Sequence, residues 1–248
     1  MILIKTKEEI QIMAEGGKIL STVLGQIEKM AKLGITTMQL DRAAEALILK
    51  HRGKPAFKGY ENFPYSLCTS VNNVIVHGFP SNYRLKEGDI VGLDLGVFYK
   101  GYNTDMAVSV AVGNVSFEAK RLLAVTKKAL KLGIKKARAG VTTGDLGNTI
   151  QRYVEDQGYG VVRELCGHGI GRNLHEDPQI PNYGQRHKGM ELKEGMVICI
   201  EPMVTMGNYQ LKKSSDGYGF ATKDGSLAAH FEHTVAITKD GCRILTAA

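Results

Sequence analysis

The sequence predicts an α+β fold built from two related halves, each with two helices followed by strands. One observation is a repeated strand region: the segment that begins with Leu85-Lys86-Glu87-Gly88 recurs 107 residues later, beginning at Leu192. Another is the segment Gly34-Ile35-Thr36-Thr37, which recurs 106 residues later from Gly140. Helices and strands in this order favour an antiparallel-rich α+β arrangement. We expect strands of both halves to face a shared cleft, where ligand sites commonly lie.

The first half predicts two amphipathic helices. Thr6 followed by Glu9 is a capping-box signal, and apolar residues then recur at helical spacing as far as about Met30. The first helix should therefore run from residue 6 to about residue 30. Thr37 can cap a second helix, which should end near Gly53 because glycine favours a helix stop.

The second half repeats this plan. Residues 117–137 have a helical pattern of apolar positions. Thr143 or Asp145 can cap a further helix, which should run to residues 157–158, where a glycine follows a glutamine.

Length and composition are those of a globular protein, with 43% apolar and 23% charged residues. No Pro-rich or Ser-rich linker separates the halves, so we expect a single domain over residues 1–248, with halves at about 1–110 and 111–248. The segment Met1–Lys5 is too short for the apolar part of a secretory signal, and no later apolar run reaches membrane-spanning length. We therefore expect a cytoplasmic protein without a membrane partner.

The formal net charge of +7 allows an anionic partner such as ribosomal RNA. The densest basic run consists of Lys127, Lys128, Lys131, Lys135, Lys136 and Arg138. A simpler interpretation is that this run is the solvated face of a helix, so we expect no sequence-specific nucleic acid. The four cysteines form no Cys-x-x-Cys pair, which argues against a zinc knuckle or a redox motif and favours free thiols.

Four acidic residues interrupt apolar, strand-like runs. Asp94 and Glu201 occupy matching positions in the two repeats, and each copy then supplies a second acid, Asp105 or Glu232, before another strand-like run. A single acid of this kind is commonly a turn residue or an exposed strand position. A buried unpaired carboxylate is costly or takes up a proton, so four at matched positions predict paired cations. Metal ions are the best candidates.

Between the acidic pairs lies the glycine-rich run Cys166-Gly167-His168-Gly169-Ile170-Gly171. Its small residues let backbone or substrate approach the imidazole, so His168 is the expected nitrogen ligand. A phosphate-binding loop is the competing interpretation, but the run lacks the strand, Gly-x-Gly-x-x-Gly and helix of a dinucleotide site. Four carboxylates and one imidazole suit Mn, Fe(II), Co or Zn in a two-metal site, where hydroxide becomes available near neutral pH to attack a carbonyl. The set predicts a hydrolase.

Short motifs surround these five residues along nearly the whole chain. They are His77-Gly78 after Ser70-Val71-Asn72-Asn73, Asp94-Leu95-Gly96, Asp105-Met106-Ala107, Gly167-His168-Gly169-Ile170-Gly171, His175-Glu176, Glu201-Pro202 and Glu232-His233-Thr234. Together they resemble the type I methionine aminopeptidases, in the compact bacterial form. The resemblance implies the pita-bread fold, a pseudo-twofold duplication with a curved, antiparallel-rich sheet, which agrees with the internal repeat.

The resemblance also implies two divalent metal ions per chain, with Co, Mn, Fe(II), Zn and Ni as candidates. Asp105 and Glu232 would bridge the two ions, His168 and Glu201 would complete the site of one, and Asp94 would complete the other. Asp94 is also expected to help hold the free amine of the substrate. Glu201 is similar to the general base of the family and would pass a proton to the leaving amine.

By the same resemblance, His77 and His175 lie over the scissile peptide, where imidazole donors stabilise charge on the tetrahedral intermediate. The alternative for each is a surface or core histidine, and on pattern alone this alternative is favoured for His77. The residues that resemble the wall of the methionine pocket are Phe57, Tyr60, Phe63, Cys68 and Tyr218. Tyr218 stands where the family usually has tryptophan, and Leu174 where it often has phenylalanine.

The implied function is removal of the N-terminal methionine from nascent proteins with small, uncharged second residues. The expected protein is a monomer that associates weakly with the ribosome. One alternative is an X-Pro peptidase of the same fold, which usually carries an additional N-terminal domain. Another is a non-catalytic pita-bread module that binds peptides, histones or RNA, but such modules typically lose the metal ligands.

Overall fold

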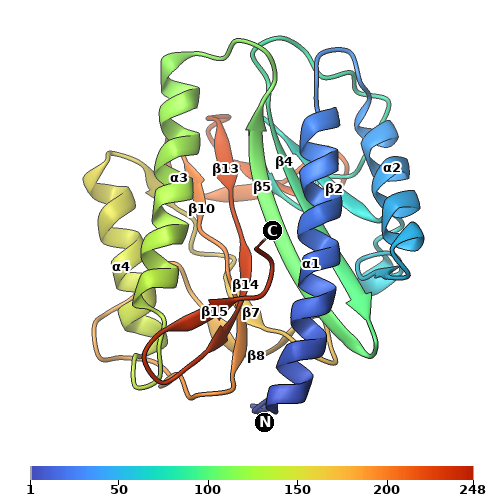
Figure 1. The fold of residues 1–248 in the computed structure, drawn as a ribbon. Coiled ribbons are helices and arrows are strands. Elements are labelled where there is room, and N and C mark those ends of the chain that lie inside the picture. Colours follow the sequence, from blue (N-terminus) through green and yellow to red (C-terminus); the bar gives the residue numbers. More distant parts are fainter. Residues whose placement is uncertain (1, 248) are drawn as a thin grey trace.

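The computed structural model describes residues 2–247 and shows helices packed on one side of curved, antiparallel strands (Figure 1). Met1 and Ala248, the ends of the expected domain, lie outside the described residues. Within that range the α-helices are α1 (Lys7–Met30), α2 (Thr37–Lys50), α3 (Phe117–Lys136) and α4 (Thr143–Asp156). The four helices expected from the sequence are therefore confirmed, with ends within a few residues of the expected ones.

The cap of α1 is the one expected: the Thr6 hydroxyl accepts the Glu9 N–H, and the Glu9 carboxylate accepts the Thr6 N–H. The expected caps of α2 and α4 are wrong: Thr37 lies one residue after the observed cap of α2, and Thr143 and Asp145 lie one and three residues after that of α4. Thr36 caps α2, and Thr142 caps α4.

The hydroxyls of Thr37 and Thr143 are used for tertiary contacts instead. Thr37 Oγ1 accepts the Ser81 N–H at 2.8 Å, and Thr143 Oγ1 accepts the Met190 N–H at 3.1 Å. Asp145 is the reciprocal member of the capping box of α4, because its carboxylate accepts the Thr142 N–H at 3.2 Å. In each pair of adjacent threonines, the first caps the helix and the second bonds to a distant loop. Helical periodicity does not show which threonine has which role.

The strands of the first half are β1 (Lys54–Pro55), β2 (Leu67–Val71), β3 (Val74–Val76), β4 (Ile90–Tyr99) and β5 (Tyr102–Ala111). A short 3₁₀ helix, η1, covers Tyr60–Asn62. Strands β1, β4 and β2 pair in that order, and β5 forms a long antiparallel hairpin with β4. Helix α1 packs on β4 and β5 and also contacts α2.

The strands of the second half are β6 (Gly160–Val161), β7 (Gly167–Gly169), β8 (Glu176–Ile180), β9 (Val197–Ile200), β10 (Met203–Thr205), β11 (Leu211–Lys213), β12 (Phe220–Thr222), β13 (Ala228–His230), β14 (His233–Ile237) and β15 (Cys242–Ile244). One sheet has the order β15-β14-β9-β7-β8, and β10 pairs with β13 and β6 in another. Strand β12 pairs with β3 of the first half as well as with β11, so a small sheet joins the two halves.

The sequence repeat is also a repeat of hydrogen bonds. The Gly34 N–H donates to Leu85 O at 2.8 Å, and the Gly140 N–H donates to Leu192 O at 2.9 Å. Each pair joins the turn before a helix to the loop before a core strand. The duplicated segments therefore occupy equivalent places in the two halves.

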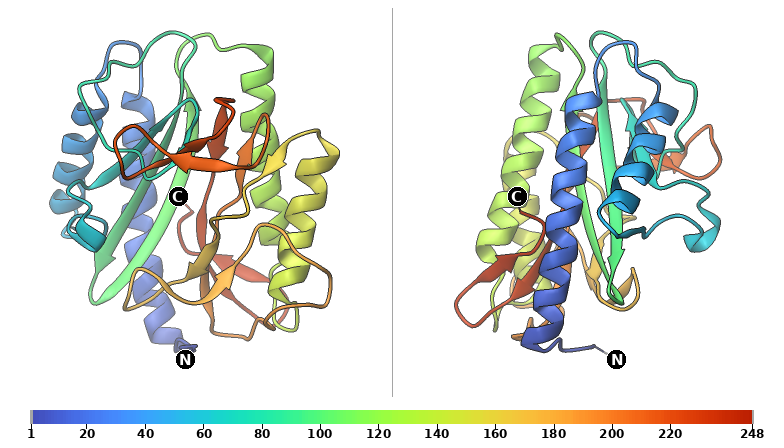
Figure 2. Two further views of the ribbon diagram at one scale, coloured as in Figure 1. Left: turned by 180° about the vertical axis from the view of Figure 1, so that it is seen from behind. Right: turned by 45° about the vertical axis from the view of Figure 1, so that its right-hand side comes forward.

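Each half has an apolar core between its helices and its strands. The first core contains Leu20, Leu24, Leu40, Leu93 and Leu95, and the second contains Leu122, Leu146, Ile150, Ile198 and Val235. Burial of each such side chain is worth roughly 1.5–3 kcal/mol, so the strands are held firmly against the helices. Figure 2 shows the same helices and strands from two further directions. Polar residues such as Asp94 and Asp105 alternate along β4 and β5 with the residues that pack on the helices. None of the described helices is long and apolar enough to cross a membrane.

Candidate active site

The first two acids lie on the β4–β5 hairpin. Asp94 pairs with Ala107 across the hairpin, and Asp105 lies two residues before Ala107 on β5. Side chains two apart on a strand share a face, so both carboxyls project from the same side of the hairpin. Thr104, the residue before Asp105, faces Gly16 of α1, so the two carboxyls lie on the side away from this helix. Both acids are buried.

The other two acids flank the central pair of strands in the second half. Glu201 follows β9 and Glu232 precedes β14, and the register of these strands places Ile200 opposite His233. The Glu232 N–H donates to Ala107 O at 2.9 Å, which attaches this segment to β5. Acids from both halves are thereby brought to one place.

A hydroxyl fastens the two halves beside the carboxyls. Thr234 Oγ1 accepts the Asp105 N–H at 2.9 Å and donates to Asp105 O at 2.8 Å. These bonds fix the backbone that carries the Asp105 side chain. Asn182 similarly donates to Glu201 O at 2.9 Å from a fully buried position.

His168 lies on β7 with one ring nitrogen directed into the acidic cluster. Its Nδ1 is 2.8 Å from Gly169 O, and Nδ1–H donates there because a carbonyl only accepts. The lone pair is therefore on Nε2, which lies 3.6 Å from Glu201 Oε1. A ring nitrogen held in this tautomer is well prepared to bind a metal ion.

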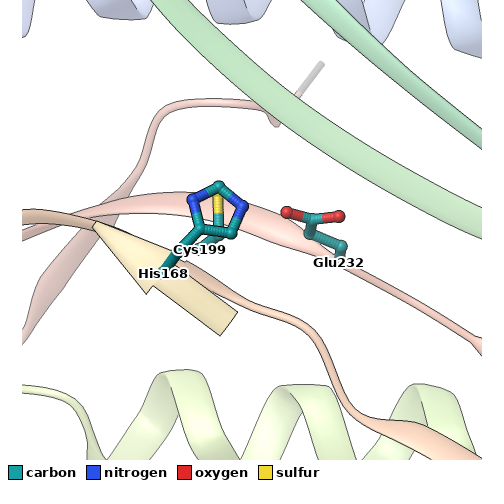
Figure 3. Close-up of side chains that lie close together, drawn as sticks. All are labelled: His168, Cys199 and Glu232. Atoms are coloured by element: carbon teal, nitrogen blue, oxygen red, sulfur yellow. The ribbon is translucent and has the colours of Figure 1, made fainter. Parts of the chain in front are cut away.

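Backbone crowding explains the glycine before this histidine. A Cβ at Gly167 would lie 2.4 Å from Cys199 O, so a side chain there would push β7 away from β9. Figure 3 shows the result: the His168 ring lies close to the Cys199 sulfur, and the Glu232 carboxylate points toward the ring. Burial raises the pKa of Cys199 well above its usual value, so this thiol stays protonated at neutral pH.

Burial also raises the pKa of every carboxyl in the cluster. The pKa of Asp94 rises to about 7, and those of Asp105, Glu201 and Glu232 rise well above their usual range. In Asp105, Glu201 and Glu232 the charge on neighbouring carboxylates adds to the effect of burial. Such a cluster takes up protons unless cations replace them.

Unpaired buried atoms concentrate at the same place. Among residues 2–247, Asp94 Oδ1, Asp105 Oδ1, Glu232 Oε1 and His230 Nε2 are fully buried and have no hydrogen-bond partner. Buried polar atoms are nearly always paired, so this cluster has the signature of a binding site for positive ions. Its oxygen-rich donors fit divalent metal ions of the first transition row.

A cavity of about 780 Å³ opens beside the cluster. The structure brings every site residue expected from the sequence to its wall: Asp94, Asp105, His168, Glu201, Glu232, His77, His175, Phe57, Tyr60, Phe63, Cys68 and Tyr218. Leu174 lines it as well. Their individual roles stay predictions.

The apolar part of the cavity is a group of aromatic rings. The Phe63 ring centroid lies 5.4 Å from that of Tyr218 and 6.4 Å from that of Phe57. Cys68 adds a buried sulfur, and burial raises its pKa well above the usual value, so it remains an uncharged thiol. This wall suits a flexible apolar side chain of moderate length.

Two further histidines lie between the aromatic wall and the acids. The His175 ring is 4.3 Å from the His168 ring, and its Nδ1 is 2.9 Å from the Tyr60 hydroxyl. His77 has a left-handed backbone with φ of 59° and lies 6.4 Å, centroid to centroid, from Tyr218. Burial is the main reason that the pKa of His77 falls to about 4, which leaves this imidazole neutral at pH 7.

Residues 11–239 match the metallopeptidase family M24. The chain belongs to this family. Membership implies divalent metal ions as cofactors, in agreement with the donor set. The M24 chain is 49% identical to a methionine aminopeptidase of Clostridium perfringens over 246 residues, 99% of each chain.

Solved structures place this M24 metallopeptidase in the pita-bread fold. It superposes on a methionine aminopeptidase of Thermotoga maritima with a TM-score of 0.98 and 43% identity, covering 100% of both chains. A prolidase of Pyrococcus furiosus gives a TM-score of 0.81 at 28% identity, and the match covers 99% of this chain but 65% of the prolidase. The predicted fold is confirmed.

Sequence reasoning missed one member of the acidic cluster in this M24 metallopeptidase. His230 is the last residue of β13, and its Nε2 lies 3.6 Å from Glu201 Oε2 and 3.7 Å from Glu232 Oε2. The available signal was its spacing, because it lies two residues before Glu232 in an extended segment and such residues commonly share a face. Cys199 likewise lies two residues before an acid of the cluster, Glu201.

Proposed function

We propose that this chain is a metal-dependent aminopeptidase that removes N-terminal methionine. The observation that carries the proposal is the continuity of one cavity, which joins a buried cluster of carboxyls and imidazoles to an aromatic pocket. A peptide whose first side chain fills the aromatic pocket would bring its first peptide bond toward the cluster. The name of the C. perfringens relative, which matches along 99% of the chain, supports the same activity.

Two divalent ions would be held by Asp94, Asp105, His168, Glu201 and Glu232. By the resemblance to the metal ligands of methionine aminopeptidases, Asp105 and Glu232 would contribute to the sites of both ions. Candidate ions are Co, Mn, Fe(II), Zn and Ni, because nitrogen and oxygen donors accept all of them. Bound in this way, the ions would lower the pKa of a water molecule and polarise the scissile carbonyl.

The protein would supply proton transfer and charge stabilisation. Glu201 is the proposed general base and would carry a proton to the leaving amine. His77 and His175 would donate hydrogen bonds to the carbonyl oxygen as negative charge develops on it. The Tyr60 hydroxyl bonded to His175 Nδ1 would hold that ring in position.

Substrate selection would rest on both parts of the cavity. Phe57, Tyr60, Phe63, Cys68 and Tyr218 would surround the methionine side chain, and Asp94 would help bind its free amine. A small, uncharged second residue would be preferred because His77 and the ions leave little space beside the scissile bond.

Metal-titrated cleavage of Met-Ala-Ser tests the proposal. We expect release of methionine only after addition of a divalent ion, at least 100-fold slower release from Met-Lys-Ser, and no cleavage of an Ala-Pro dipeptide. Asp105→Ala and His168→Ala should abolish turnover while circular dichroism shows the fold intact. Preferred cleavage of Ala-Pro would instead identify an X-Pro peptidase, and metal-loaded protein that cleaves neither peptide would favour a pure binding role.

We further propose nascent polypeptides as the substrates, with the cytoplasm as the site of action and a monomer as the active form.

Helix α3 has an exposed basic face, as expected for a solvated helix face. It consists of Lys127, Lys128, Lys131 and Lys135. This face would give weak, salt-dependent docking near the ribosome exit. At low salt the wild-type chain should sediment with ribosomes, and the double variant Lys128→Glu, Lys131→Glu should stay in the supernatant. Equal sedimentation of the two proteins contradicts docking through α3.

A further inference from the structure

His230 faces the candidate metal centre but does not belong to the five-residue set. Its side chain is 3% exposed, and its Nε2 has no hydrogen-bond partner within the described part of the chain. Glu201 Oε2 is 3.6 Å away and Glu232 Oε2 is 3.7 Å away. A buried ring nitrogen between two acids without a bond to either requires an explanation.

The separations indicate a shared ion rather than hydrogen bonds. A contact of 3.6 Å or more is too long for a hydrogen bond. Two ligand atoms bound at about 2.1 Å to one ion lie roughly 3.0–3.5 Å apart, only slightly closer than the distances here. His230, Asp94 and Glu232 also present one ligand atom each, all within 4.8 Å of one another.

The backbone of His230 is held from two sides. Its N–H donates to Ser109 Oγ at 2.9 Å, and Ser109 Oγ donates to His230 O at 2.8 Å. Residue 230 is also paired with Met203 in the β10–β13 ladder. The Ser109 bonds attach the backbone of His230 to β5, the strand that carries Asp105, and so fix the position of this residue beside the acids.

We propose that His230 Nε2 is a sixth protein ligand of the metal centre and shares an ion with Glu232. The proposal rests on the metal-dependent function above and extends its ligand set to two imidazoles and four carboxylates. A second nitrogen donor favours Fe(II), Co or Zn over Mn, because imidazole suits the former ions better. The chain would therefore discriminate more strongly against Mn than a centre with one imidazole.

Proton NMR of the cobalt(II)-loaded wild-type protein tests the assignment directly. A histidine bound through Nε2 keeps its Nδ1–H, which gives a strongly shifted, solvent-exchangeable resonance near a paramagnetic ion. We expect two such resonances, one lost in His168→Ala and the other in His230→Gln. One resonance in the wild-type protein, lost in His168→Ala, overturns the role of His230 and leaves the proposed function standing. No shifted resonance at all contradicts the metal site itself.

Metal affinity measured by calorimetry gives a second readout that does not depend on turnover. His230→Gln should weaken cobalt binding at least about 10-fold, the lower end of the loss seen when groups supporting a metal site are removed. His233→Gln is the matched control, because His233 is next to Glu232 but its Nδ1 is bonded to Thr246 Oγ1 at 2.9 Å. Unchanged cobalt affinity in folded His230→Gln overturns the proposal, as does an equal loss in His233→Gln.

Discussion

Lys5 Nζ lies 2.7 Å from Glu176 Oε2, and the two side chains are only 4% and 7% exposed. This buried ion pair joins the segment before α1 to the residue that follows His175. The other carboxylate oxygen of Glu176 accepts the Asn173 N–H at 3.0 Å. A Cβ at Gly171 would lie 2.6 Å from Lys5 Cε, so a side chain there would displace the lysine of this pair. The pair thus fixes the loop that presents His175 to the cavity.

Lys5→Met should destabilise the protein by about 3–5 kcal/mol, because it leaves the Glu176 carboxylate buried without its partner. Thermal denaturation should show a fall in Tm of roughly 10 °C for a chain of this size. Adding Glu176→Gln should restore most of the loss. Lys100→Met is the control: its partner is Glu15, both side chains are largely exposed, and the expected change is about 0–1 kcal/mol. Equal losses in the two single variants would refute a special role for the buried pair.

Two glycines of α1 should respond in opposite directions to alanine. A Cβ at Gly17 would lie 2.1 Å from Leu245 O, so Gly17→Ala should cost about 1–3 kcal/mol by forcing the C-terminal segment away from the helix. Gly25 has open space at the same atom, so Gly25→Ala should stabilise the protein by roughly 0.5–1 kcal/mol through helix propensity. Chemical denaturation of both variants checks the prediction, and stabilisation by Gly17→Ala contradicts it.

The stability of the metal-free protein should depend on the ionisation of Asp94. Burial raises its pKa from 3.8 to about 7, so the folded state holds a proton that the unfolded state releases from about pH 4 upward. Its contribution to stability is therefore present below pH 4 and is lost as the pH rises toward 7.

Asp94→Asn isolates this effect because asparagine stays neutral at every pH. In the metal-free state, the Tm of the variant should rise relative to that of the wild-type protein as the pH increases from 5 to 8, by roughly several degrees. With cobalt present the order should reverse, because the variant lacks a ligand. A Tm difference that does not change with pH would show that Asp94 is ionised throughout.

His175→Ala should lower kcat about 100-fold with little change in KM, the pattern of a donor that acts as charge develops. Tyr60→Phe keeps the ring in the pocket wall but removes the hydroxyl 2.9 Å from His175 Nδ1, and should lower kcat about three- to tenfold. His187→Ala, in an exposed loop, should leave both constants unchanged. A larger effect of Tyr60→Phe than of His175→Ala would reverse the proposed roles.

The helices and the location of the site were accessible to sequence reasoning for identifiable reasons. Helix α1 has a capping box and a long apolar stripe, which are local signals, and the four acids stood out because each interrupts an apolar strand. The caps of α2 and α4 were misplaced because two adjacent threonines are chemically equivalent in sequence. The hydroxyl of the second threonine in each pair bonds to a loop, at Ser81 or at Met190, which leaves the first threonine to cap the helix.

The duplication, the helices and the carboxyl and imidazole candidates can be read from the chain alone, because periodicity and residue type are local properties. Which of these groups meet depends on the packing of the folded protein. Three features depend on how segments far apart in sequence pack at a particular register. They are the place of His230 beside the acids, the Lys5–Glu176 pair and the Thr234 hydroxyl at Asp105. Register is set by the sum of many core contacts, and no single motif encodes it.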